Sequence, residues 1–269
     1  MSIASKTWRE VRSLVLLYLF LLFGLLLLAL LYWPQARDIL REMGGQYSFL
    51  APTKALKKFF ADASSHVESA AFAAYVAVQH FFKAISIVGI ACAVLLGTGT
   101  IAKEKERGSF EFLVSRPISR FRILWPITWV LTLCLIVPIF VSSLLIPWIS
   151  PLWGQSLPTR GLLQGAIHAS LFVELFLLLT LLLSVLLKNQ VQVATGIGAI
   201  VIFEVGIFFV PGIRNVSIFK LTDYEVYQFM IPGNLDYAHF FWSTDIWLIL
   251  ANLALFALTS ALFQRRDIG

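Results

Sequence analysis

Charged residues and cysteines are both scarce in this sequence. Only 13% of the 269 residues are Asp, Glu, Lys or Arg, whereas 59% are hydrophobic, and the mean hydropathy is +0.83. Soluble domains carry about 25% charged residues, so the composition excludes an ordinary water-soluble protein. The two cysteines, Cys92 and Cys134, both lie within apolar runs. Their number and placement exclude a disulfide framework and a cysteine-based metal site.

Motifs for catalysis and nucleotide binding are missing as well. The sequence has no GxxxxGK[ST] phosphate-binding loop, and its densest glycine cluster, residues 97–100, lacks the lysine that such a loop needs. It has no HExxH pair of the kind that would indicate a membrane-embedded metalloenzyme. We therefore predict that this chain is not itself an enzyme and has no cofactor or metal of its own.

Long apolar runs are what the sequence has in abundance. A helix needs about 20 apolar residues to cross a hydrocarbon core of about 30 Å, and these runs are continuous and rich in leucine, which favours helices. The sequence predicts an all-α membrane protein with a single transmembrane domain over residues 1–269. The six predicted spans cover about 13–33, 81–101, 123–149, 162–187, 191–210 and 243–263.

The first run follows three basic residues and resembles a signal peptide at first sight. It is longer than the apolar part of a secretory signal and lacks a small-x-small cleavage site, so we interpret it as an uncleaved span. The Trp33-Pro34 pair is expected to end it.

The distribution of Lys and Arg predicts the orientation. Twelve of the 21 basic residues fall in segments 1–13, 102–122, 188–190 and 264–269, which total 43 positions. The other nine are spread over 93 positions of the opposite loops. Because cytoplasmic segments are enriched in Lys and Arg, both termini and segment 102–122 are predicted to be cytoplasmic. This placement of the basic residues at span ends, without interleaved aromatics on a polar surface, argues against nucleic acid as a partner.

Two longer segments are predicted on the outer side. In residues 34–80, apolar side chains recur at helical spacing opposite a basic face, which predicts an amphipathic helix near 54–63 that lies on the outer leaflet or packs over the bundle. Residues 212–242 are rich in Tyr, Phe and Trp, which favours an interfacial loop. An extracytoplasmic cap over an exit path is the alternative for that loop.

The charged segment 102–122 is the most distinctive part of the chain. Phe110, Leu113 and Val114 share one helical face, Gly108 allows a tight turn, and Pro117 prevents the helix from continuing. Glu104, Glu106 and Glu111 are available to meet basic groups. A short amphipathic element of this kind suits docking into a groove of a soluble partner.

The order of residues in this segment resembles the signature of the type-two ABC-transporter permeases. That signature runs acid-x-acid-x-Gly-Thr-x-Glu-x-Leu-hydrophobic-Ser-x-Pro-hydrophobic-Ser-Arg between the second and third of six spans. The matching positions are Glu104, Glu106, Gly108, Glu111, Leu113, Ser115, Pro117, Ser119 and Arg120. Ser109 replaces the usual Thr and keeps its hydroxyl group, and Phe110 and Phe112 are bulkier than usual. The ending Phe263-Gln264-Arg265-Arg266-Asp267 also resembles a common tail of this family.

The resemblance implies a permease that pairs with a second permease subunit, identical or different, and with two separate ATPase subunits that bind ATP and Mg²⁺. The segment would be a coupling helix between spans 2 and 3. Its ATPase-docking residues would be Glu104, Glu106, Arg107, Gly108, Ser109, Phe110, Glu111, Leu113 and Val114. The family consists mainly of exporters, and a small permease without a fused ATPase is typical of a prokaryotic plasma membrane, which is the inner membrane in a Gram-negative cell.

Two carboxylates fall within predicted spans, Glu174 in the fourth and Glu204 in the fifth. A charged side chain at this depth costs a few kcal/mol, so each is expected to face the bundle or to be protonated. We predict that they line the translocation path. A satisfied hydrogen bond between helices is the structural alternative.

The glycines of the fifth span, Gly196, Gly198 and Gly206, predict close packing of that helix within the subunit. The long outer segments leave one alternative function open. In it, the chain transports nothing and instead transmits ATPase-driven motion to an extracytoplasmic partner. The sequence does not indicate the substrate.

Overall fold

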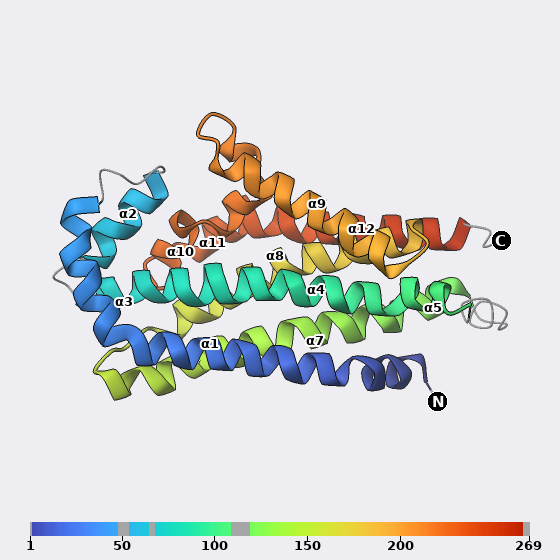
Figure 1. Ribbon diagram of the computed structural model, residues 1–269, viewed down its shortest axis with the longest axis horizontal. Coiled ribbons are helices and arrows are strands. Elements are labelled where there is room, and N and C mark those ends of the chain that lie inside the picture. Colours follow the sequence, from blue (N-terminus) through green and yellow to red (C-terminus); the bar gives the residue numbers. More distant parts are fainter. Residues whose placement is uncertain (1, 48–53, 65–67, 109–118, 266–269) are drawn as a thin grey trace.

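The computed structural model describes residues 2–47, 54–64, 68–108 and 119–265, and in these ranges the chain is helical, with no β-strand. Figure 1 shows the long helices running side by side along one axis. The α-helices are α1 (Ile3–Tyr47), α2 (Lys54–Ala63), α3 (Glu68–Val76), α4 (Gly89–Gly97), α5 (Lys103–Glu106), α7 (Arg120–Ile149), α8 (Thr159–Leu186), α9 (Gln190–Phe209), α10 (Tyr224–Met230), α11 (Tyr237–Phe240) and α12 (Ile246–Arg265). Wider π-helical turns cover Ala77–Val88, Thr98–Ala102 and Phe241–Asp245, and 3₁₀ turns cover Ser150–Trp153, Arg214–Val216 and Ile218–Thr222.

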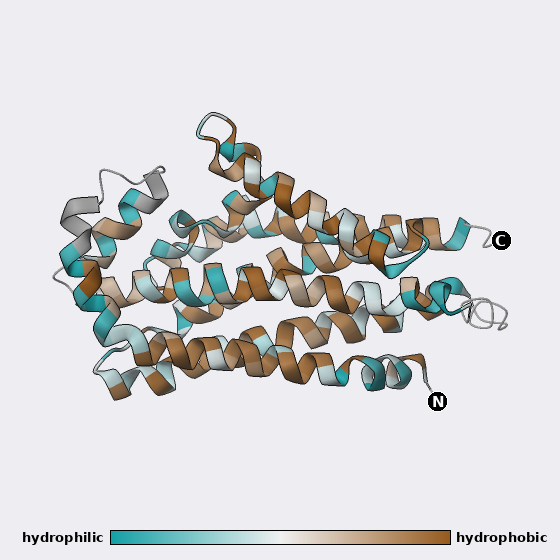
Figure 2. Ribbon diagram, viewed as in Figure 1, coloured by the Kyte–Doolittle hydropathy of each residue, from teal (hydrophilic) through white to brown (hydrophobic). Residues whose placement is uncertain are grey.

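Six helical stretches are long and apolar enough to cross a membrane, which confirms the predicted class of fold. They are Ile3–Glu42, Glu68–Glu106, Arg120–Trp153, Thr159–Leu186, Gln190–Phe209 and Tyr237–Arg265. Figure 2 shows hydrophobic residues along the middle of these helices and hydrophilic residues gathered toward their ends. The chain is therefore a multi-pass membrane protein.

The first helix does not end at Trp33-Pro34, as the sequence suggested, but continues to Tyr47 with Pro34 inside it. The reason lies in packing. The Trp33 side chain is only 1% exposed and lies 5.1 Å, between ring centroids, from both Phe72 and Tyr75. The Tyr75 hydroxyl also donates to the Ala29 carbonyl oxygen at 3.0 Å. These contacts hold the helix in place across the proline, whose missing amide removes only one backbone hydrogen bond.

The second span starts earlier than predicted, because α3 runs without a break into the π-helical turns Ala77–Val88 and then into α4. Helix formation in Lys54–Ala63 agrees with the amphipathic pattern of that segment. Within α2, Ala63 is fully buried, the Phe59 ring lies 5.4 Å from the Tyr224 ring, and the Tyr224 hydroxyl donates to Asp62 at 2.7 Å. This helix therefore packs over the bundle, against α10.

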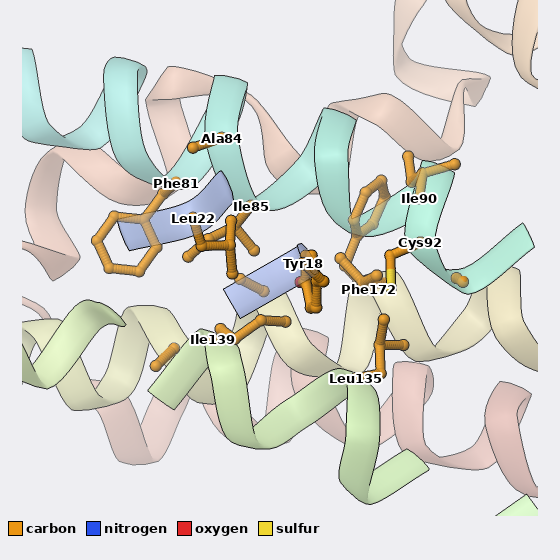
Figure 3. Packing of buried hydrophobic residues seen from close by; sticks show 14 of the residues in the cluster. Tyr18, Leu22, Phe81, Ala84, Ile85, Ile90, Cys92, Leu135, Ile139 and Phe172 are labelled. Carbon is orange, nitrogen blue, oxygen red and sulfur yellow. The ribbon is translucent and has the colours of Figure 1, made fainter. Parts of the chain in front are cut away.

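The core lies where α1, the second span, α7 and α8 converge. Figure 3 shows Tyr18, Leu22, Phe81, Ile139 and Phe172 from these four helices pointing toward one another, and each is at most 1% exposed. Burial of such side chains contributes roughly 1.5–3 kcal/mol each in water, but in lipid close packing supplies most of the association energy.

One glycine shows how close the packing is. A Cβ atom added at Gly97 would lie 2.6 Å from Thr180 Cγ2. The backbone of α4 therefore lies directly against α8. The Ser184 hydroxyl of α8 donates to the Gly97 carbonyl oxygen at 3.1 Å. Small residues at helix contacts of this type allow the backbones to approach in a membrane.

The expectation for the fifth span was wrong. Only 17% of its most apolar window is buried, and a Cβ atom at Gly198 or Gly206 would meet nothing within 4 Å. Gly196 alone of the three approaches α8, near Leu183. Helix α9 therefore lies at the outside of the subunit, and Gly198 and Gly206 do not serve packing within it.

Both ends of the described chain lie at the same end of the bundle as α5 (Figure 1). We call this the α5 end; it comprises residues 3–10, 103–108, 186–192 and 263–265. The opposite end, which carries α2, α3 and α10, is called the far end. For the described residues 3–10, 103–108 and 263–265, this arrangement agrees with the predicted placement of the termini and the charged segment on one side.

Candidate functional site

The part of the predicted coupling segment that the structure describes is α5 with the two residues after it. Helix α5 continues the second span through the π-helical turn Thr98–Ala102 and ends at Glu106. The chain then turns at Gly108, whose φ of +67° is a left-handed conformation that glycine adopts without strain. Five of the predicted docking residues, Ser109, Phe110, Glu111, Leu113 and Val114, lie outside the described residues.

Glu104 faces the first span. Its carboxylate accepts from Lys6 Nζ at 2.9 Å, and the same ammonium group lies 3.8 Å from Glu10, one turn further along α1. The Glu104 side chain is only 16% exposed. This acid therefore ties α5 to the start of α1 and presents little surface to a partner.

Lys105 joins α5 to the fourth span. Its ammonium nitrogen lies 2.8 Å from the Ser184 carbonyl oxygen, 2.7 Å from that of Val185 and 3.2 Å from that of Leu187. These carbonyl groups belong to the last turn of α8, where backbone acceptors have no partner within the helix. A cation is favoured there by the helix dipole as well. Lys105 thus caps the C-terminus of α8 from a different helix.

Glu106 and Arg120 complete the connections at this end. Glu106 Oε2 accepts from Gln190 Nε2 at 3.0 Å, at the first residue of α9. Arg120, the first residue of α7, donates to the carbonyl oxygens of Phe263 and Gln264 at the end of α12, at 3.1 and 3.3 Å. The described coupling residues and their neighbours therefore contact the α5-end termini of the other spans.

Exposure separates these residues by role. Glu106, Arg107 and Gly108 are exposed at the α5 end, whereas Glu104 and Lys105 are half-buried. The exposed group is suited to meeting a partner, and the half-buried group holds the spans. Sequence reasoning did not single out Lys105, Lys6 or Gln190, although Lys near a helix C-terminus is a recognisable signal for Lys105 once the helix ends are known.

Glu174 lines a cavity of about 230 Å³ between α7, α8 and α12. It is half-buried, and its Oε1 accepts from the Thr132 hydroxyl at 3.0 Å. The residues around it are Trp125, Thr128, Trp129, Thr132, Leu171, Leu178, Ile249, Asn252, Leu253 and Phe256. A carboxylate in a cavity of a transmembrane bundle fits the general rule that intramembrane charges line pathways or sites.

Glu204 is not near Glu174's cavity but at the far end of α9. Its Oε2 accepts from the Ile218 backbone N–H at 2.8 Å, and its carbonyl oxygen accepts from the Ser217 hydroxyl at 2.8 Å. The carboxylate thus satisfies a donor at the start of the 3₁₀ turn Ile218–Thr222. This contact favours the structural alternative for Glu204, and its role in a path stays a prediction.

Comparison with known families identifies the chain by class. The model of the family described as ABC-2 family transporter protein matches residues 1–268, so this chain belongs to that family. The six spans and the position of α5 after the second of them are consistent with a permease component of an ABC transporter. No curated protein and no solved structure matches the chain.

Proposed function

We propose that this chain is the transmembrane permease subunit of an ATP-driven exporter. Two separate ATPase subunits would bind ATP and Mg²⁺ and would dock at the α5 end, on Glu106, Arg107, Gly108 and the residues that follow. A second permease subunit, identical or different, would complete the pathway. The single observation that carries the proposal is Lys105, which links the docking segment directly to the C-terminus of α8, the helix that holds Glu174.

The orientation follows from charge. The α5 end holds the segments densest in Lys and Arg, so we place it in the cytoplasm. Cytoplasmic ATPases would then approach the exposed residues of α5, and the lipid bilayer of a prokaryotic plasma membrane would surround the six spans. The far end, with α2 packed against α10, would face outward and is where an extracytoplasmic partner would bind.

Affinity purification tests the docking assignment. The tagged chain, extracted from its native host in detergent, is expected to bring down an ATPase subunit that contains a phosphate-binding loop. The Arg107→Glu variant reverses an exposed charge at the α5 end and is expected to lose that subunit. Arg160→Glu makes the same change at an exposed position of the far end and is the matched control.

Gel filtration of both variants checks that the fold is kept. Recovery of no ATPase subunit with the native chain would overturn the proposal. Equal recovery with Arg107→Glu would instead move the docking site away from α5. If the ATPase of the purified complex rises when a transported compound is added, the exporter is favoured over the alternative in which the pair only transmits force outward.

A further inference from the structure

The cavity beside Glu174 lies in the half of the bundle nearer the α5 end. Trp125 follows the start of α7 by five residues, and Glu174 precedes the end of α8 by twelve. At a rise of 1.5 Å per residue, these side chains lie about 8 and 18 Å from the α5 end of their helices. The cavity therefore reaches from the level of one membrane boundary to about the middle of the bilayer.

One chemical property dominates the lining: it carries a carboxyl group with no positive partner among the described residues. Of its eleven residues, Glu174 alone is ionisable. The Thr132 hydroxyl donates to one carboxylate oxygen, while Thr128 donates to the Leu124 carbonyl oxygen of its own helix at 3.0 Å. Among the described residues, no Lys, Arg or His forms an ion pair with Glu174.

A second acceptor lies in the same lining. Asn252 donates through Nδ2 to the Leu171 carbonyl oxygen at 3.0 Å, and its Oδ1 has no hydrogen-bond partner among the described residues. Buried acceptors without a donor are uncommon in native proteins. That oxygen is itself inaccessible, so the capacity of the lining for a cation rests on the Glu174 carboxyl group.

Aromatic rings form part of the remaining wall. The Trp125 ring centroid lies 5.8 Å from that of Trp129 and 5.5 Å from that of Phe256, both nearly edge-on. Trp125 and Trp129 are 44% and 48% exposed, so parts of both indoles remain uncovered by this subunit. Indole faces attract organic cations within about 6 Å, and the attraction strengthens where water is excluded.

We propose that this cavity binds a lipophilic organic cation, an alkylated or protonated amine with an apolar body. The charged nitrogen would pair with Glu174 beside Trp125 and Trp129, and the apolar body would lie along Leu178, Leu253 and Phe256. The proposal deepens the proposed function, because it names the class of compound that the permease would take up from the leaflet at the α5 end.

Other ligands fit the lining less well. An anionic lipid would meet a carboxylate with no cation to balance it, which is repulsive at low dielectric. A hard metal ion needs several oxygen ligands, and one carboxylate among indoles and leucines does not supply them. A neutral lipophile would leave the Glu174 carboxyl group without a charged partner within the hydrocarbon region.

Equilibrium binding of benzyltrimethylammonium to the purified chain in lipid nanodiscs tests the proposal. We expect saturable binding that Glu174→Gln weakens by roughly tenfold or more, because the variant removes the negative charge that attracts the cation and a loss of about 1.4 kcal/mol is tenfold. Glu42→Gln removes an exposed carboxylate at the far end and is expected to leave binding unchanged. Benzenesulfonate, an anion of similar size, is expected not to bind.

A second variant, Trp129→Ala, keeps the carboxylate and removes one aromatic wall, and it serves as the test if Glu174→Gln fails to fold. It is expected to weaken binding several-fold. Trp148→Ala, at an exposed position of the same helix, is its control. Absence of saturable binding to the native chain would overturn the proposal. Binding as tight as that of the native chain by both Glu174→Gln and Trp129→Ala would also overturn it. The assay needs no ATPase. Binding without ATPase recovery would therefore reject the proposed function alone, and ATPase recovery without binding would reject the cavity assignment alone.

Discussion

The Lys105 ammonium nitrogen lies 2.7 Å from the Val185 carbonyl oxygen, so a residue of the second span caps the end of the fourth. Helix α8 runs from this cap past Glu174 to Thr159 at the far end. If ATPase subunits dock at α5 as proposed, we expect a displacement of α5 to be transmitted along α8 to the cavity through this polar contact.

Replacing Lys105 is therefore expected to separate docking from transport. Lys105→Met keeps most of the apolar stem and removes the ammonium group, leaving the last carbonyl groups of α8 without their donor. We expect the variant to retain the ATPase subunits but to lose most substrate-stimulated ATPase activity, measured on the purified complex. Lys105→Arg keeps a charged donor and is expected to retain part of it.

Loss of ATPase recovery with Lys105→Met would show instead that Lys105 contributes to docking itself. The control is Lys103→Met, a neighbouring half-buried lysine at the start of α5. That change is expected to leave stimulation near the native level. Equal stimulation in all three variants would contradict transmission through the α8 cap.

The sequence predicted the six spans because each one is a long apolar run whose signal is local. It predicted the turn at Gly108 for the same reason, since a glycine between charged residues indicates a turn whatever lies near it in space. It misplaced the end of α1, because Pro34 normally interrupts a helix and only the packing of Trp33 against Phe72 and Tyr75 overrides it. The glycines of α9 led to a wrong prediction of close packing, since composition does not reveal which face of a helix meets the bundle.

The candidate site shows the same division. Glu174 is conspicuous in the sequence as a charge within an apolar run, but its partner Thr132 and the indoles of Trp125 and Trp129 are about 40 residues or more away in the chain. Glu204 gave an equally strong sequence signal, and only its contact with the Ile218 N–H distinguishes it. Long-range pairs of this kind have no local pattern to predict them.

Gly97 is expected to tolerate no larger side chain. Gly97→Ala places a methyl group 2.6 Å from Thr180 Cγ2, and overpacking of this kind typically destabilises by about 1–3 kcal/mol. Thermal unfolding in detergent measures the effect. Gly99→Ala is the matched control two residues away, because a Cβ there meets nothing within 4 Å; it is expected to be neutral or slightly stabilising, since alanine favours helix over glycine.

Removing the Thr180 methyl group should relieve part of the strain. Gly97→Ala combined with Thr180→Ser, which removes the methyl group and keeps the hydroxyl that donates to the Phe176 carbonyl oxygen, is therefore expected to unfold at a higher temperature than Gly97→Ala alone. The rescue is partial because Thr180 Cβ itself would lie 2.8 Å from the new methyl group. Equal unfolding temperatures for Gly97→Ala and Gly99→Ala would contradict the close approach of α4 to α8.

A buried polar cluster joins the fourth and sixth spans near the far end. His168 Nδ1 lies 2.6 Å from Asp245 Oδ1, both side chains are fully buried, and Tyr237 donates to the other carboxylate oxygen at 2.9 Å. His168 Nε2 must donate to the Leu221 carbonyl oxygen, which lies 2.7 Å away and only accepts. Asp245→Ala is expected to destabilise by about 3–5 kcal/mol, because removal of one partner leaves the other buried without its hydrogen bond.

A double-variant cycle checks that this cost comes from the pair. His168→Phe with Asp245→Leu replaces both polar groups by apolar ones and is expected to be more stable than Asp245→Ala alone. Unfolding in detergent provides the measurement. Additive effects of the two single changes would mean that the histidine and the aspartate do not stabilise one another.

Acid is expected to weaken the loop at the far end through Glu225. The Lys220 ammonium group donates to Glu225 and lowers the pKa of that carboxyl group below its ordinary value near 4.5. A group whose folded pKa is lowered contributes stability that is fully present above the unfolded pKa and is lost as the pH falls through the folded pKa. The contribution of Glu225 should thus be present at pH 7 and be lost progressively as the pH falls below about 4.5.

The size of this effect is limited by solvent, because a third of the Glu225 side chain is exposed. Such pairs contribute about 0–1 kcal/mol, so Glu225→Gln should lower the unfolding temperature slightly at pH 7. As the pH falls through the lowered pKa of Glu225, the unfolding temperatures of the native chain and the variant should converge, since the native carboxyl group then becomes protonated. A difference in unfolding temperature that grows toward low pH would have the wrong sign for a carboxylate stabilised by Lys220. It would show that Glu225 does not stabilise this loop.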